Sequence, residues 1–186
     1  RVTISRAKLS IEYDCSVILV ASCNPCVCGN FNDRKKQCTC PPGAVQKYLS
    51  KISGPLLDRI DLHIEVTPVD FNALSSSRES EKSSDIRKRV VKARGWQEQR
   101  FKEIDHLHFN AQMSPNMTRI ICEIDEHGQD LIKLAMEKLG LSARAYDRIL
   151  KVARTIADLA DSKRIEPEHL AEAIHYRSLD RDSWGG

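Results

Sequence analysis

The chain has 186 residues, a formal net charge of +3 and 41% hydrophobic residues, which is ordinary for one compact domain or two small ones. This composition excludes collagen-like, mucin-like and strongly disordered proteins. Aromatic residues make up only 5% and charged residues 30%, a balance that favours a helix-rich soluble protein over a β-sandwich or barrel. The longest apolar run, residues 17–21, is far shorter than the roughly 20 residues that a membrane-spanning helix needs, so no membrane partner is expected.

The chain begins at Arg1 rather than at a methionine, and its first residues have the pattern of a strand. We therefore expect it to be a piece of a longer protein, and its lack of a signal peptide carries no information about location. Of the seven cysteines, five lie between Cys23 and Cys40. This clustering is the most unusual feature of the composition.

Short apolar segments in the first part of the chain are typical of strands. Residues 2–4 and 9–11 predict a hairpin, and residues 17–21 predict a buried strand of a parallel sheet because they are apolar on both faces. Residues 23–43 form a loop rich in Cys, Gly, Asn and Pro, and residues 44–52 predict a short helix that ends at the Ser-Gly-Pro turn of 53–55. Residues 62–66 alternate as a further strand, stopped by Pro68. The first 74 residues are thus expected to be α/β.

Residues 75–85 are rich in serine and charge, which predicts a linker between two domains. Beyond it, residues 86–186 have a helical pattern, and a small helical bundle is expected. Start and stop signals include a capping Ser142, a terminating Gly140 and Pro167 in a first turn. The predicted helices cover 86–103, 114–123, 125–139, 142–160 and 166–176.

The densest basic run lies on the first of these predicted helices. It comprises Arg87, Lys88, Arg89, Lys92 and Arg94. Such a run is either a solvated helix face or a contact for a polyanion such as nucleic acid.

Two C-x-C pairs face each other across a short flexible loop. The pairs are Cys26 with Cys28, and Cys38 with Cys40. Four thiolates at this spacing suit the tetrahedral coordination that structural Zn²⁺ prefers, and the basic residues 34–36 would offset the negative charge of such a site. The spacing differs from the commoner C-x2-C of zinc ribbons, so cross-pair disulfides or an iron–sulfur cluster stay open as alternatives.

The remaining cysteines are not expected to bind metal. Cys23 could serve as a fifth donor, but it sits at the end of the predicted buried strand, which favours a structural thiol. Cys15 and Cys122 are isolated, and we expect both to be buried small hydrophobic residues.

The chain contains no phosphate-binding loop of the G-x-x-x-x-G-K-[ST] type, and it has neither H-E-x-x-H nor G-x-S-x-G. The candidate functional residues are instead polar groups at the ends of apolar elements. Asn24 follows the predicted buried strand, where parallel-sheet proteins place ligand-facing groups. Arg59 lies in a turn before a strand, and Arg144 begins a helix. Taken singly, each arginine is most simply explained by an ion pair.

Taken together, these residues lie in motifs that resemble the magnesium-chelatase-like AAA+ ATPases of the ComM/YifB type. The resemblance covers nearly the whole chain. It is carried by VASCNPCVCG at 20–29, SGPLLDRIDLH at 53–63, NAQM at 110–113, LSARAYDRIL at 141–150 and AEAIHYR at 171–177.

This resemblance implies a role for each candidate residue. Residues 1–13 would be the hairpin that precedes sensor 1, and Asn24 the sensor-1 residue near the γ-phosphate. Arg59 would be the arginine finger that reaches a neighbouring subunit's nucleotide, and Arg144 the sensor-2 residue of a helical lid. A guanidinium suits these roles because it stabilises the charge that develops on a transferred phosphoryl group. Cys23 departs from the family pattern, which usually has an apolar residue there, and is left out of the metal set.

The resemblance also implies a cytoplasmic ATP- and Mg²⁺-dependent ATPase that forms a homo-oligomeric ring, expected to be hexameric, and that remodels or branch-migrates DNA. The phosphate loop would precede Arg1, so the chain alone is expected to be inactive. Two other functions stay open. One is the motor subunit of a magnesium chelatase, which acts on a porphyrin and in which the cysteine loop is not expected. The other is a zinc-stapled nucleic-acid-binding module.

Overall fold

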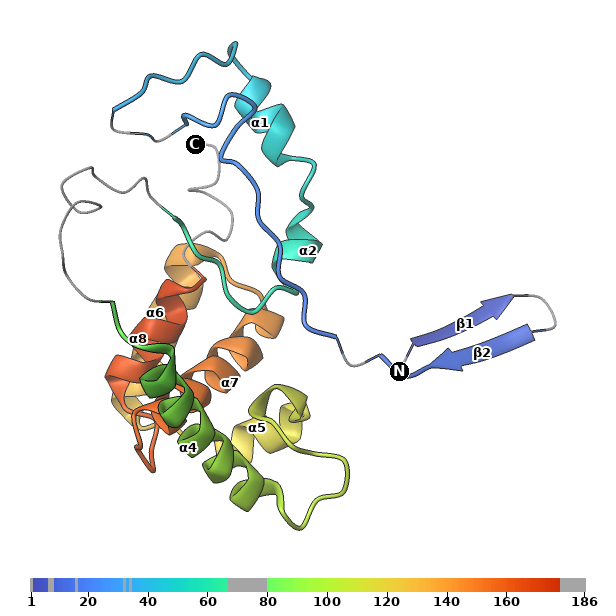
Figure 1. Ribbon diagram of the computed structural model, residues 1–186, viewed down its shortest axis with the longest axis vertical. Helices are drawn as coiled ribbons and strands as arrows, with labels where there is room; N and C mark the ends of the chain where they lie inside the picture. The colour runs from blue at the N-terminus through green and yellow to red at the C-terminus, as the bar shows by residue number, and fades with distance from the viewer. Residues whose placement is uncertain are drawn as a thin grey trace.

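The computed structural model describes residues 2–6, 9–15, 17–31, 33, 35–66 and 80–177 (Figure 1). These residues form an extended hairpin, a Cys-containing loop with two short helices, and a bundle of longer helices. The elements are β1 (Val2–Arg6), β2 (Leu9–Tyr13), α1 (Ala44–Leu49), α2 (Gly54–Leu57), α4 (Ser83–Phe101), the 3₁₀ helix η1 (Asn110–Gln112), α5 (Pro115–Ile121), α6 (Glu126–Leu139), α7 (Ala143–Leu159) and α8 (Pro167–His175).

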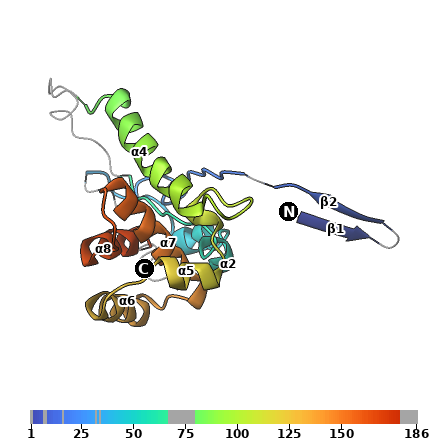
Figure 2. The ribbon, with the colours of Figure 1, turned by 90° about the horizontal axis from the view of Figure 1, so that it is seen from below.

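Strands β1 and β2 form the predicted hairpin and pair antiparallel, with Ile4 opposite Ile11. Since side chains alternate along a strand, Val2, Ile4, Leu9, Ile11 and Tyr13 share one face. The other face is polar, and the hydroxyl oxygens of its Ser5 and Ser10 are 2.9 Å apart. The hairpin extends away from the other elements in both ribbon views, and all of its described residues are exposed (Figures 1 and 2).

The helices of the second half begin and end at the residues that local chemistry favours. Ser114, Asp125 and Ser142 each accept a hydrogen bond from a backbone N–H in the first turn of α5, α6 and α7. Gly140 ends α6 in the left-handed conformation, and Pro167 lies in the first turn of α8. The predicted bundle is therefore confirmed, with helix ends within three residues of those expected.

The hydrophobic core lies entirely among these helices. Helix α7 is its centre, because it packs against α4, η1, α5 and α8, while α8 also packs against α6. The apolar stripe of α7 that the sequence predicts faces inward, with Ile149 and Ala153 fully buried. The cluster comprises Phe101, Met113, Cys122, Ile132, Ile149, Leu150, Ala153, Ala157, Ile165, Leu170 and Ala173.

A polar network is buried beside this core and joins α4, η1 and α7. The Asp158 carboxylate, 3% exposed as a residue, receives two hydrogen bonds from the Arg100 guanidinium, at 2.6 and 2.8 Å. It also receives one from the Asn110 amide at 2.8 Å and one from Arg154 Nε at 3.2 Å. Asn110 in turn donates to Thr155 Oγ1 and accepts from Arg100. Two arginines thus share one carboxylate, and both of its oxygens accept hydrogen bonds.

Two predicted strands are not formed. Residues 17–20 are irregular and 70–91% exposed, and residues 62–66 are also irregular. A parallel strand needs neighbours that accept and donate its backbone hydrogen bonds, and no other strand of the described residues lies beside either segment. The expectation of parallel strands is therefore wrong for the part of the chain that the structure describes, whose sheet is the antiparallel hairpin.

Smaller differences occur at the connections. The Ser-Gly-Pro turn does not simply stop a helix: Pro55 lies in the first turn of the short helix α2, and α1 ends at Leu49. Helix α4 begins at Ser83, within the predicted linker, whose residues 75–79 lie outside the described residues, as does Pro68. None of the described helices combines the length and apolar character that crossing a membrane requires.

Candidate metal centre and arginine-lined cavity

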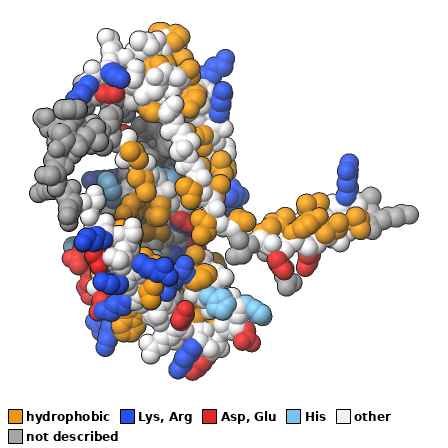
Figure 3. Space-filling model, viewed as in Figure 1, with side chains coloured by type: hydrophobic (Ala, Val, Ile, Leu, Met, Phe, Trp, Pro, Cys, Tyr) orange, Lys and Arg blue, Asp and Glu red, His pale blue; other side chains and the backbone are white. Residues whose placement is uncertain are grey.

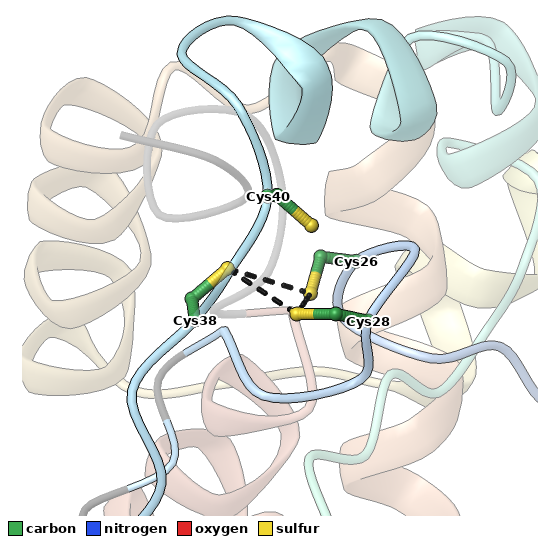
Figure 4. Close-up of side chains that lie close together, drawn as sticks. All are labelled: Cys26, Cys28, Cys38 and Cys40. Atoms are coloured by element: carbon green, nitrogen blue, oxygen red, sulfur yellow. Dashed lines mark hydrogen bonds between the residues drawn. The ribbon is translucent and has the colours of Figure 1, made fainter.

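The four cysteines of the two C-x-C pairs converge at one point (Figure 4). Their sulfur atoms all lie within 4.8 Å of one another. The Sγ–Sγ distances are 3.3 Å for Cys26–Cys28, 3.5 Å for Cys28–Cys38 and 3.8 Å for Cys26–Cys38. A tetrahedral zinc site with Zn–S bonds of about 2.3 Å has sulfur atoms about 3.8 Å apart. The arrangement is therefore compatible with zinc, and the shortest separation is much longer than a disulfide bond of about 2.05 Å.

The thiols of the cluster differ in how readily they lose a proton. Backbone hydrogen bonds at Asn30 and Thr39 lower the pKa of the Cys28 thiol to about 5. At Cys38 a backbone hydrogen bond with Cys40 lowers the pKa, but burial and the neighbouring thiols outweigh it and raise the value to about 12. Thiolates so close together repel one another, so four of them are stable only around a positive ion.

Tight turns hold the two pairs in place. After the first pair, Gly29 adopts a positive φ of 80°, and its N–H donates to the Cys26 carbonyl at 3.1 Å. Between the pairs, the Asp33 carboxylate accepts the backbone N–H groups of Lys35 and Lys36. After the second pair, Gly43 adopts a φ of 76° and leads into α1. The loop is thus shaped by its own backbone and by the cysteines.

The other three cysteines stay outside the cluster. Cys122 is buried in the helical core, as expected. Cys15 and Cys23 are exposed, so the expectation that Cys15 is a buried hydrophobic residue is wrong. Cys15 lies just before the irregular segment 17–20 and Cys23 just after it, and no sheet of the described residues covers a thiol at either position.

Arg144 lines a cavity of about 490 Å³ between the segment after α2 and the faces of α7 and α8. Arg144, Arg148 and Lys151 are spaced so that all three reach it from one side of α7. Asp61, Asp147 and Glu172 line it as well, so the cavity is of mixed charge. The spacing of the three cations was visible in the sequence, but only the fold identifies the segment that faces them.

Two of the three cations are already engaged. Arg148 forms an ion pair with Asp61. Lys151 donates from Nζ to the carbonyls of Met113 at 2.6 Å and Ala111 at 3.2 Å, and burial lowers its pKa. Arg144 is exposed, and within the described residues its guanidinium has no hydrogen-bond or ion-pair partner. It is therefore the cation that can bind an anionic ligand without breaking a contact.

Arg59 and Asn24 lie elsewhere. Arg59 is exposed just after α2, and its guanidinium donates to the Pro55 carbonyl at 2.6 Å. Asn24 is exposed at the end of the irregular segment that precedes the cysteine loop. No hydrogen bond joins Asn24, Arg59 and Arg144 within the described residues. Arg59 is nevertheless two residues from Asp61, which contacts α7.

Backbone contacts tie this segment to the helical bundle. The N–H of His63 donates to the Tyr176 carbonyl at 2.8 Å, and the buried Arg177 donates to the Ile60 carbonyl. With the Asp61–Arg148 ion pair, these three contacts clamp residues 60–63 onto α7 and the end of α8. Sequence spacing gave no signal for these pairs, because their partners lie more than 80 residues apart.

The described chain thus consists of a hairpin and cysteine-loop region followed by a capped helical bundle, with an exposed arginine in the first turn of α7. Two family models match it: magnesium chelatase, subunit ChlI, over residues 1–74, and magnesium chelatase, subunit ChlI C-terminal, over residues 80–177. The chain belongs to the magnesium chelatase ChlI family.

Individual relatives place it more closely within that family. It is 37% identical over 181 residues to the competence protein ComM of Haemophilus influenzae, and 36% identical over 182 residues to the protein YifB of Escherichia coli. Each alignment covers 97% of this chain but only 34% and 35% of the relative. The chain therefore spans about a third of the length of the curated relatives it matches.

Proposed function

We propose that this chain is the C-terminal part of an AAA+ ATPase module, in which residues 1–74 complete the α/β core and residues 86–186 form the helical lid. Its membership of the magnesium chelatase family supports this assignment. ATP and Mg²⁺ would be bound with the help of residues outside the chain.

The observation that carries the proposal is the unengaged Arg144 in a cavity where Arg148 and Lys151 are already bound. In the proposed site Arg144 acts as sensor 2 and contacts the terminal phosphate of ATP. Asn24 acts as sensor 1. Arg59 reaches the nucleotide of a neighbouring subunit, and its exposure supports this role. An arginine supplied in this way accelerates phosphoryl transfer by about 10³ to 10⁵ in comparable enzymes.

We further propose that the ATPase assembles as a homohexameric ring and remodels or branch-migrates DNA. The similarity to a competence protein over 97% of the chain supports this substrate class.

The test is ATP-dependent unwinding of branched DNA by a full-length protein that carries this chain. Arg59→Ala is expected to lower turnover by about 10³-fold or more while nucleotide binding persists. Arg59→Lys is the matched control, and it is expected to rescue little because lysine lacks the planar fork of arginine. Unchanged turnover in Arg59→Ala would contradict the finger role.

The second candidate is the motor subunit of a magnesium chelatase, which the family description favours. The two candidates share the ATPase and differ in the substrate. ATP turnover that is stimulated by a porphyrin and Mg²⁺ but not by branched DNA would favour the chelatase. The cysteine loop supports the DNA-directed candidate. Its first cysteine pair lies in the motif at 20–29 that resembles the ComM/YifB type, and such a loop is not expected in a chelatase motor subunit.

We propose that Cys26, Cys28, Cys38 and Cys40 hold one structural Zn²⁺. The sulfur geometry supports it. Elemental analysis of the purified chain is expected to give about one zinc per chain, and Cys38→Ser is expected to lower this strongly. A brown protein with visible absorption would instead indicate an iron–sulfur cluster.

A further inference from the structure

The cysteine loop and the helix that follows it carry a strong local excess of positive charge. Residues 15–57 contain five basic residues and one acidic residue, Asp33, so their formal charge is +4 in a chain whose net charge is +3. Four thiolates around Zn²⁺ would add a charge of −2, which still leaves an excess of +2. The five basic residues are Arg34, Lys35, Lys36, Lys47 and Lys51.

The described lysines of this region face solvent. Lys36, Lys47 and Lys51 are all exposed, and no carboxylate of the described residues forms an ion pair with any of them. The carboxylate of Asp33 is occupied by backbone N–H groups of its own turn. Figure 3 shows Lys and Arg side chains on both sides of the upper end of the molecule, where the loop and α1 lie.

Two of these lysines lie side by side at the end of the helix that follows the loop, and the third, Lys36, lies in the loop two residues before Cys38. The Ala44 N–H donates to the Pro41 carbonyl at 3.0 Å, so α1 starts directly beside the second cysteine pair. Lys47 and Lys51 are four residues apart, and the Lys51 N–H still bonds to the Tyr48 carbonyl, so both lie on one side of the helical turn. Lys51 also lies 6.0 Å from the centre of the Tyr48 ring. We call Lys36, Lys47 and Lys51 the Cys-loop basic surface.

The basic run on α4 has a different environment. Lys88 pairs with Asp85, Arg89 with Glu81, and Lys92 with Asp161. Arg94 lies over the ring of Phe109, 3.9 Å from its centre. The densest basic segment of the sequence is thus largely neutralised by its own neighbours.

We propose that the Cys-loop basic surface binds the phosphate backbone of a nucleic acid. A polymer with closely spaced negative charges can engage several lysines at once and release the counterions that they hold, whereas a small anion engages only one. Lysines without carboxylate partners lose no ion pair on binding. This inference rests on the DNA-directed part of the proposed function and assigns the contact to a surface that the ATPase residues do not use.

The test compares two variants of the zinc-loaded chain with equal loss of charge. Lys36→Gln/Lys47→Gln/Lys51→Gln removes the Cys-loop basic surface. Lys88→Gln/Arg89→Gln/Lys92→Gln removes the same charge from α4. Binding of fluorescein-labelled single-stranded and double-stranded DNA of mixed sequence is followed by fluorescence anisotropy without nucleotide, over about 50 to 200 mM salt. Zinc content and circular dichroism check that each variant is folded.

The loop variant is expected to bind at least about tenfold more weakly at 100 mM salt, with a salt slope smaller by about two to three. The α4 variant is expected to stay within about threefold of the wild-type chain. An equal loss in both variants, or a loss in the α4 variant alone, would overturn the inference. Absence of binding by the wild-type chain would overturn it too. The proposed function is tested separately by branched-DNA unwinding with the full-length protein, because that assay requires ATP and Arg59 whereas the binding assay requires neither.

Discussion

The seven cysteines occupy three chemical environments, and each environment determines how a thiol reacts. Cys15 and Cys23 are exposed, four sulfurs meet in the cluster, and Cys122 is enclosed by the helical core. Burial raises the pKa of the Cys122 thiol to about 12, so almost none of it is thiolate near pH 8. Thiol chemistry can therefore report on the metal site and on the core separately.

We predict that an aromatic disulfide reagent modifies only Cys15 and Cys23 rapidly in the zinc-loaded native chain. A chelator is expected to expose the four cluster thiols to the reagent, and Cys122 is expected to react only after unfolding. Spectrophotometric counting of the released thiolate gives the three stages. Cys15→Ser/Cys23→Ser serves as the control and should remove the first stage. Reaction of six thiols before chelation would contradict a metal-bound cluster.

At the scale of the elements, one carboxylate joins α4, η1 and α7. Asp158 lies between Arg100 and Arg154, and its side chain is 1% exposed. Removal of one partner from a buried charged group leaves the other charges uncompensated, which costs far more than an exposed ion pair contributes.

We predict that Asp158→Ala lowers the free energy of unfolding by about 3 to 5 kcal/mol, because two guanidinium groups lose their shared partner. Urea denaturation followed by circular dichroism measures the change. The control is Asp130→Ala, an exposed acid on α6, expected to change stability by less than about 0.5 kcal/mol. A loss below about 1 kcal/mol in Asp158→Ala would show that the network contributes little.

Helices α6 and α8 approach each other closely at Gly128. A Cβ atom added there would lie 2.8 Å from Cδ1 of Leu170, whose side chain is fully buried and has little room to move. Gly95, in the exposed middle of α4, has no atom within 4 Å of the same position. The two glycines are thus a matched pair with opposite environments.

We predict that Gly128→Ala destabilises the chain by about 1 to 3 kcal/mol through overpacking. Gly95→Ala is expected to stabilise it by about 0.5 to 1 kcal/mol, because alanine has the higher helix propensity and lowers the conformational entropy of the unfolded chain. Thermal unfolding of both variants gives the two signs. A stabilising Gly128→Ala would mean that α6 can move away from α8.

At the scale of the whole molecule, the sequence predicted the parts whose signals are local. Ser142 and an apolar stripe indicate helix α7, and two cysteine pairs close in sequence indicate the cysteine cluster. Asp158 with Arg100, by contrast, joins residues 58 positions apart, and no local pattern identifies such partners. The segment 17–20 has the composition of a buried strand, but a strand also needs neighbours that composition does not provide.

The two halves of the chain are stabilised by different means. The hydrophobic cluster lies wholly in the helical bundle, between Phe101 and Ala173. In the described first half, three residues are buried: Cys26, Leu49 and His63. Of these, His63 is one of the residues that contact the end of α8. The proposed zinc would therefore be the main constraint on the cysteine loop, whereas the bundle is stabilised by its hydrophobic core.

We predict that removal of zinc unfolds the loop locally and leaves the thermal unfolding of the helices almost unchanged. Amide hydrogen exchange of residues 26–52 should speed up strongly on chelation, while the Tm followed by the helical circular dichroism signal should shift by less than about 2 °C. Cys38→Ser/Cys40→Ser should give the same result without a chelator, which excludes an effect of the chelator itself. A fall in Tm of more than about 5 °C, which corresponds to over 1 kcal/mol for a chain of this size, would show that the loop and the bundle unfold as one unit.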